Sequence, residues 1–188
     1  VGSEMCIRDR FNKGYASMDY YRYLEFNDNY GIIPVQNGKN LTLNVPVTSA
    51  VPGAKGVKAD CITDGASLDS STYFQKSSNA TIGTPYMFTV DMQKKARISE
   101  INLSTRLVNG SEAAYKYTIE GSLDGKSYKM LVDGRTNWQV GFLILNVEDP
   151  TAYRYLRLRI YGVVNIHKGN SAMWADGIYE FTALGIPE

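Results

Sequence analysis

The chain has 188 residues, of which 44% are hydrophobic and 21% charged, as in a globular domain large enough to bury a core of its own. The 20 Lys and Arg residues against 19 Asp and Glu residues give a formal net charge of +1, which argues against a protein that binds nucleic acid through its phosphates. No apolar run approaches the roughly 20 residues that a membrane-spanning helix needs. The 14 Tyr and 17 Gly residues, with little helical periodicity, favour an all-β protein.

The first 39 residues differ from the rest of the chain in their sequence pattern. Residues 1–10 (VGSEMCIRDR) resemble a translated sequencing adapter, and they lack the cationic start and apolar core of a signal peptide. We therefore expect residues 1–10 to be a non-native leader. Residues 27–31 (NDNYG) predict a turn, and the polar residues 36–39 (QNGK) are typical of a domain boundary. Residues 11–39 are accordingly interpreted as the end of an upstream domain or a linker.

Extended segments dominate from residue 40 onward. Leu41 and Leu43 alternate with polar neighbours, which is the period of two that a half-buried strand shows. The spacing of three between Ile98 and Ile101 indicates a bulge or bend, and the Asp-Gly pair at 124–125 predicts a hairpin turn. Strands are expected at residues 40–47, 85–92, 97–104, 115–122, 127–132, 141–147, 155–161 and 177–185. Their number and the turns between them predict a β-sandwich or jelly roll.

Seven segments in this part of the chain occur in the order of a known family. They are residues 40–48 (NLTLNVPVT), 62–65 (ITDG), 85–92 (PYMFTVDM), 98–103 (ISEINL), 117–131 (YTIEGSLDGKSYKML), 153–162 (YRYLRLRIYG) and 177–185 (GIYEFTALG). The chain resembles a coagulation factor 5/8 type C, or discoidin, domain and is similar to family 32 carbohydrate-binding modules. The resemblance implies an eight-stranded jelly-roll sandwich of the galactose-binding-like fold at residues 40–188. It also implies a non-catalytic module that binds polysaccharide or glycan.

A second resemblance concerns residues 20–35 (YYRYLEFNDNYGIIPV). This string is similar to the closing segment of a five-bladed β-propeller glycosidase of the family 43 kind. It implies that the module follows the catalytic domain of a glycoside hydrolase in the same chain, and that the protein is secreted, periplasmic or on the cell surface. The alternative is a linker hairpin that packs on the sandwich.

The family resemblance also implies a structural calcium ion. Its members supply ligands from an early Asp-Gly turn, a following Thr and a Glu on the last strand, which match Asp64, Thr72 and Glu180 here. Oxygen ligands of this kind are what Ca²⁺ requires. The sequence departs from the usual spacing, because Thr72 follows Asp64 by eight residues where five is more common in the family. Asp69 is therefore expected to take part of the role. The alternative is an ordinary turn at Asp64.

Sugar recognition needs an aromatic ring that stacks on the apolar face of a pyranose and a few polar groups that fix its hydroxyls. In the family these groups lie on loops at one end of the sandwich. Trp138 stands in a polar loop, which favours a stacking platform over a core position. Trp174 fits a platform or a plug beneath the sandwich equally well, and His167 is also explained as a hydrogen-bonded surface residue. The predicted sugar-binding residues are Tyr73, Arg106, Arg135, Asn137, Trp138, His167 and Trp174.

No pattern of catalytic residues is apparent, so we expect this chain not to be an enzyme by itself. A single His argues against a Ser-His-Asp arrangement, and the Gly residues are dispersed at turns instead of forming a phosphate-binding loop. A discoidin-type adhesion or structural module, packing on a partner domain, a protein or a lipid surface, is the alternative function. Residues 141–145 (GFLIL) would supply its apolar contact if they were exposed.

Overall fold

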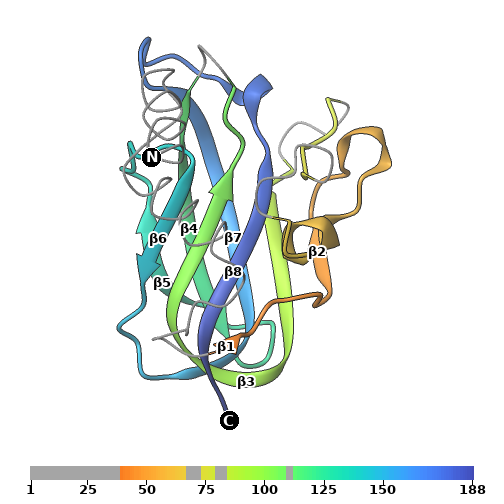
Figure 1. The fold of residues 1–188 in the computed structure, drawn as a ribbon, viewed down its shortest axis with the longest axis vertical. Helices are drawn as coiled ribbons and strands as arrows, with labels where there is room; N and C mark the ends of the chain where they lie inside the picture. The colour runs from red at the N-terminus through yellow and green to blue at the C-terminus, as the bar shows by residue number, and fades with distance from the viewer. Residues whose placement is uncertain (1–38, 67–72, 79–83, 109–111) are drawn as a thin grey trace, which may run out of the picture.

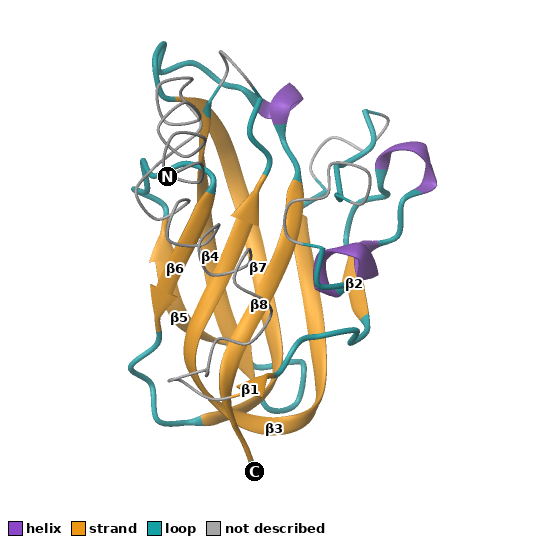
Figure 2. Cartoon of the chain, viewed as in Figure 1, coloured by secondary structure: helices purple, strands orange, loops and turns teal. Residues whose placement is uncertain are grey.

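The computed structural model describes residues 39–66, 73–78, 84–108 and 112–188. The predicted leader, the segment resembling a propeller terminus, Asp69 and Thr72 lie outside these residues. The strands are β1 (Lys39–Asn40), β2 (Val47–Ser49), β3 (Tyr86–Thr105), β4 (Ala113–Ser122), β5 (Lys129–Gly134), β6 (Phe142–Asn146), β7 (Ala152–Asn165) and β8 (Ile178–Pro187) (Figure 2). Three short 3₁₀ turns accompany them, η1 (Ala54–Gly56), η2 (Ala59–Thr63) and η3 (Met173–Ala175). The predicted all-β fold is confirmed.

The strand β3 belongs to both layers of the sandwich. Its first half pairs with β7 and β2, and its second half pairs with β8 and β6, all antiparallel. The register shifts between Asp91 and Ala96, where Gln93 takes a φ of 64° and the strand curves through the bottom of the molecule (Figure 1). One layer therefore contains β5, β4, β7 and β2 with the first half of β3, and the other contains β6, β8 and β1 with its second half. The two strands predicted at 85–92 and 97–104 are the two halves of β3.

The strand predicted at residues 40–47 is wrong, because the chain turns between β1 and β2. Asn44 has a φ of 56°, which ends regular strand geometry. Thr42 is fully buried, and its hydroxyl donates to the carbonyl of Phe181 and accepts from the amide of Ala183. Leu43 is 49% exposed instead of facing the core. A buried threonine that satisfies two backbone groups of β8 thus replaces the expected apolar alternation.

The core lies between the two layers and follows the period of two of the long strands. In β7, Leu156, Leu158 and Ile160 are buried, and in β4 the corresponding residues include Tyr117 and Ile119. The apolar run of β6 also contributes, since Phe142 and Leu143 are buried. The exposed apolar loop that the adhesion alternative needed at 141–145 is therefore not present.

Three of the connections between strands lie at one end of the sandwich. Registers such as Ala113 with Asn165, Tyr117 with Gly134 and Ser104 with Phe142 bring the β3–β4, β5–β6 and β7–β8 connections to that end (Figure 1). This end carries Arg106, Trp138, His167 and Trp174. Among the described residues, no helix has the length and apolar character that crossing a membrane requires.

Candidate functional site

Trp138 lies in the β5–β6 connection and is 57% exposed. The Lys116 Nζ atom lies 3.8 Å from the centroid of its ring and donates a hydrogen bond to the carbonyl of Asn137. An ammonium ion against an indole face is an attractive cation–π contact. The pKa of Lys116 is lowered by desolvation. Trp138 is thus supported from one side by a side chain that projects from β4.

Asn137 fixes the turn that presents Trp138. Its backbone amide donates to the carbonyl of Gly134 over 3.1 Å, and its Nδ2 donates to the carbonyls of Tyr115 and Gln139 over 3.1 and 3.0 Å. Its Oδ1 accepts from the amide of Gln139. The structure thus places Asn137 as a residue that holds the loop, and its predicted contact with a sugar stays a prediction.

Arg135 forms a forked ion pair with Asp133 beside this turn. Its Nε donates to Oδ1 of Asp133 over 2.9 Å and its Nη2 to Oδ2 over 2.6 Å. Both side chains are exposed, and the hydrogen bonds from Arg135 lower the pKa of Asp133 to about 2. The pair presents planar donors and acceptors to solvent. Asp133 and Lys116 were missed by the sequence reasoning, although the spacing Asp133-Gly-Arg135 on one strand end was a usable signal.

Tyr73 and Arg106 meet at a different position, next to β8. The Arg106 guanidinium lies 5.0 Å from the centroid of the Tyr73 ring, and Tyr73 packs edge to face on Tyr179 with centroids 5.6 Å apart. A Cβ at Gly177 would come within 2.9 Å of the Arg106 side chain and 3.0 Å of the Tyr73 ring. The structure therefore brings these two predicted residues together in a tightly packed cluster on the β8 side.

Trp174 and His167 lie in the β7–β8 connection. Trp174 is 62% exposed, so it is not a plug beneath the sandwich, and its carbonyl accepts from Nε2 of Gln75. The Nε2 atom of His167 lies 2.8 Å from Oε2 of the buried Glu112. This contact ties two loops together, and it supports the hydrogen-bonded surface role for His167.

Glu180 and Asp64 supply the carboxylates of the predicted metal site. Glu180 is 2% exposed, its Oε2 accepts from the amide of Gly65 over 3.1 Å, and its Oε1 is buried without a hydrogen-bond partner. Burial raises the pKa of Glu180 to about 8, and the charge of Asp64 adds to the effect. Among the described residues, no group of three or more His, Cys, Asp or Glu side chains could hold a metal ion. A buried, unpartnered carboxylate oxygen beside a second carboxylate nonetheless fits a hard cation with oxygen ligands.

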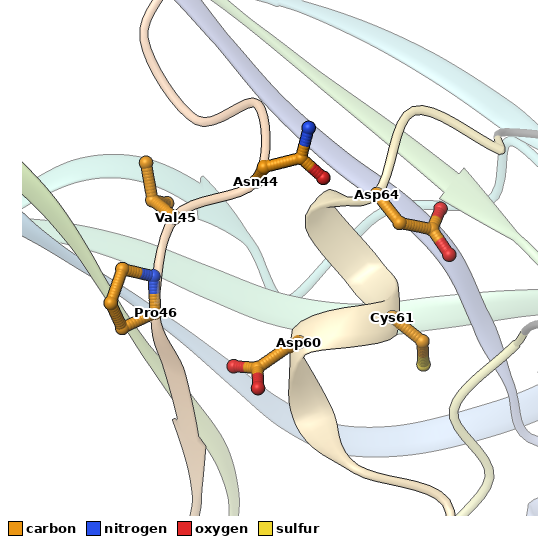
Figure 3. Close-up of a pocket in the computed structure, with 6 residues that line it drawn as sticks. All are labelled: Asn44, Val45, Pro46, Asp60, Cys61 and Asp64. Carbon is orange, nitrogen blue, oxygen red and sulfur yellow. The ribbon is translucent and has the colours of Figure 1, made fainter.

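A shallow hollow of about 420 Å³ opens beside this pair, between the segment before β2 and η2 (Figure 3). Val45 and Pro46 form one wall and η2 the other, where Asp60 accepts a hydrogen bond from the amide of Val47 over 2.8 Å. Burial and the surrounding carboxylates raise the pKa of Cys61 to about 12. The thiol is therefore protonated at neutral pH and is not a nucleophile.

The comparisons with known proteins agree with this architecture. The family model described as F5/8 type C domain matches residues 46–176. The module CpGH89CBM32-6 of Clostridium perfringens is 17% identical with a TM-score of 0.58, over 78% of this chain and 99% of its own. Chitosan-binding module 2 of a Paenibacillus sp. IK-5 chitosanase/glucanase, solved with chitotriose, has the same identity and TM-score over 78% and 100%. The family 89 glycoside hydrolase of Clostridium perfringens is 24% identical with a TM-score of 0.59, over 79% of this chain and 15% of its own. No curated protein matches the chain in sequence.

Proposed function

Because the chain belongs to the F5/8 type C domain family, we propose that it is a non-catalytic carbohydrate-binding module whose sugar platform is Trp138. The observation that carries the proposal is the way this ring is presented. It is 57% exposed, yet Lys116 and the fully bonded Asn137 hold it in place. A large apolar ring that is both exposed and fixed is typical of a binding surface.

The surroundings of Trp138 fit a sugar better than those of Trp174. Arg135 and Asp133 lie three and five residues before Trp138 in the chain, and their forked pair offers planar hydrogen-bonding groups that can orient hydroxyls. Trp174 is also exposed, but the carboxylate near it, Asp176, is buried and accepts from Gln75 and the amide of Lys76. We therefore assign the platform to Trp138.

The module would act by holding a larger enzyme on its substrate. The matching parts of the structural neighbours include a chitosan-binding module and about a seventh of a glycoside hydrolase chain, which supports a glycoside hydrolase as the upstream partner in the same chain. Binding of this kind raises the local concentration of enzyme at a polysaccharide even when each contact is weak. A secreted, periplasmic or cell-surface location follows from a polysaccharide target.

A calcium ion would strengthen the fold at the start of β8. Glu180 and Asp64 would hold it, together with Asp69 and Thr72 in a segment outside the described residues. The support is the buried Oε1 of Glu180, which has no hydrogen-bond partner. A bound cation would give this oxygen atom a favourable partner. The ion would stiffen the turn at Gly65 against β8 and take no part in chemistry.

Affinity electrophoresis tests the proposed function. The module would be run in native gels that contain xylan, arabinan, β-1,4-galactan or glycol chitosan. We expect retardation by at least one polysaccharide, and a loss of about tenfold in affinity for Trp138→Ala, as for a central aromatic contact. Leu123→Ala is the matched control, because Leu123 is also an exposed apolar residue, 47% exposed, but lies in the β4–β5 hairpin at the opposite end. Migration unchanged in all four gels would refute the proposal.

A further inference from the structure

A second exposed aromatic side chain lies on the same face as Trp138. Tyr161 of β7 is 55% exposed, and its hydroxyl lies 3.4 Å from Oγ1 of Thr118. Thr118 lies two positions after Lys116 on β4, and Lys116 is the residue that supports Trp138. Residues two apart on a strand share a face and are separated by about 7 Å. The two aromatic side chains are thus placed one after the other along the outer face of β4.

A β-bulge lies beside Tyr161. Lys116 pairs with Gly162 and Tyr117 pairs with Ile160, so Tyr161 is the additional residue on β7. Tyr161 faces solvent by the period of two that buries Leu158 and Ile160. The bulge brings Gly162 opposite Lys116, so that Tyr161 and Gly162 are consecutive residues at the outer face.

Gly162 leaves the surface next to Lys116 open. A Cβ at this position would meet only Cγ of Lys116, at 4.0 Å, and Gly162 is not among the glycines with positive φ. Neither a special backbone conformation nor close packing therefore requires a glycine here. Because Gly162 has no side chain, the space between Lys116 and Tyr161 stays open.

Polar groups border the same surface. Asp133 pairs with Thr118 across β4 and β5 and holds Arg135 in the forked contact described above. Thr118, which lies opposite Asp133 in this register, also lies 3.4 Å from the Tyr161 hydroxyl, so the pair and Tyr161 lie on either side of Thr118. A donor and acceptor pair is thus available beside both rings.

We propose that the module binds a linear oligosaccharide along the outer face of β4, with consecutive sugar units on Trp138 and Tyr161. This surface, the β4 strip, consists of Lys116, Asp133, Arg135, Trp138 and Tyr161, while the buried Thr118 lies beneath it and contacts the Tyr161 hydroxyl. The inference rests on the proposed function and deepens it, since it makes the ligand at least two consecutive units of a chain instead of one terminal sugar. Arg135 and Asp133 orient the hydroxyls at the edge of the strip.

Calorimetry with a trisaccharide and a monosaccharide tests the β4 strip. The probes are the trisaccharide and the monosaccharide of whichever of the four polysaccharides retards the module. Tyr161→Ala removes the second platform, and Gly162→Leu fills the open space. We expect each to weaken trisaccharide binding about tenfold and monosaccharide binding less than about twofold. Trp138→Ala weakens both, and Leu123→Ala weakens neither.

The outcomes separate the two claims. Trisaccharide binding that is unchanged in Tyr161→Ala overturns the β4 strip and leaves the proposed function standing, as does an equal loss for monosaccharide and trisaccharide. Absence of binding to all four polysaccharides overturns both. Circular dichroism and thermal unfolding verify that Gly162→Leu is folded, and Tyr161→Ala decides the question if it is not.

Discussion

Single residues decide whether Trp138 can serve as a platform. The polar loop around it was enough to predict an exposed tryptophan, but its support comes from Lys116, more than twenty positions earlier in the chain. The ammonium group lies against the ring and binds the preceding carbonyl. Exposure alone would leave a mobile side chain whose ordering opposes binding. The fixed position of the Trp138 ring therefore depends on its contact with Lys116 of β4.

Replacing Lys116 by Met tests this support. The Lys116→Met variant keeps an unbranched apolar stem but loses the ammonium group, which contributes about 0.5–1 kcal/mol to a cation–π contact at an exposed site. We expect the affinity for the retarding polysaccharide to fall about two- to fivefold and acrylamide quenching of tryptophan fluorescence to increase. Lys126→Met, in the β4–β5 hairpin, is the control. Equal affinities of the two variants would show that Lys116 does not position the ring.

Calcium binding is tested at Glu180. Calcium should raise the melting temperature of the wild-type module, because a ligand that binds only the folded state stabilises it. Glu180→Gln keeps the shape of the side chain but lacks the charge, so its melting temperature should be the same with calcium and with EGTA. A wild-type melting temperature that calcium leaves unchanged would contradict the proposed metal.

At the scale of elements, β3 and β7 hold the sandwich together. Leu158 of β7 is fully buried and pairs with Phe88 of β3 on one side and with Ile119 of β4 on the other. The sequence predicted this inward alternation, and the structure confirms it. The division of β3 between two layers was not predictable, because the pairing partners of its two halves lie far away in the chain and local patterning does not specify them.

A cavity at Leu158 should cost much of the stability of the domain. Leu158→Ala is expected to lower the free energy of unfolding by about 2–5 kcal/mol, as for other buried Leu residues. Leu123→Ala, the same change at an exposed turn, should change it by less than about 0.5 kcal/mol. Urea denaturation measures both. Comparable losses in the two variants would argue against the described core.

The β6–β7 connection is fastened by Asp149. Its carboxylate binds Lys129 over 2.8 Å, the hydroxyl of Tyr153 over 2.8 Å and the amide of Thr151 over 2.9 Å. The hydrogen bond from Lys129 is the main reason why the pKa of Asp149 lies well below its ordinary value. The carboxylate is therefore ionised in the folded state at pH values where the unfolded chain already binds a proton.

Because folding lowers the pKa of Asp149, its contribution to stability should decrease in acid. The contribution of Asp149 is complete above its unfolded pKa of about 4 and is lost as the pH falls below that value towards the folded pKa. Asp149→Asn should lower stability by about 1 kcal/mol at pH 7. The wild type should lose stability between about pH 5 and pH 2, because Asp149 is protonated in the unfolded chain within this range. Asp149→Asn lacks this carboxylate and should lose less stability over the same range. Urea titrations at several pH values measure this, and parallel curves for the two proteins would contradict it.

At the scale of the whole molecule, the net charge is close to zero, and charged side chains on the surface form local ion pairs. Exposed cations such as Arg135 and Arg154 are matched by carboxylates on the same face, so the sheet surface is polar without a strong field. The sequence could indicate the fold and predict that Trp138 lies exposed in a loop, as the structure has it. It could not reveal the contact of Lys116 with Trp138 or the bulge beside Tyr161, because the first joins residues far apart in the chain and the second depends on how β4 and β7 are aligned.

Nuclear magnetic resonance of the two tryptophan side chains tests the central claim most directly. The chain contains 2 Trp residues, so a ¹⁵N-labelled module gives two indole N–H signals, which Trp138→Phe assigns. During titration with the trisaccharide of the retarding polysaccharide, the Trp138 signal should shift progressively while the Trp174 signal stays in place. A shift of Trp174 alone, or no shift of either signal at saturation, would contradict the assignment of Trp138 as the sugar platform.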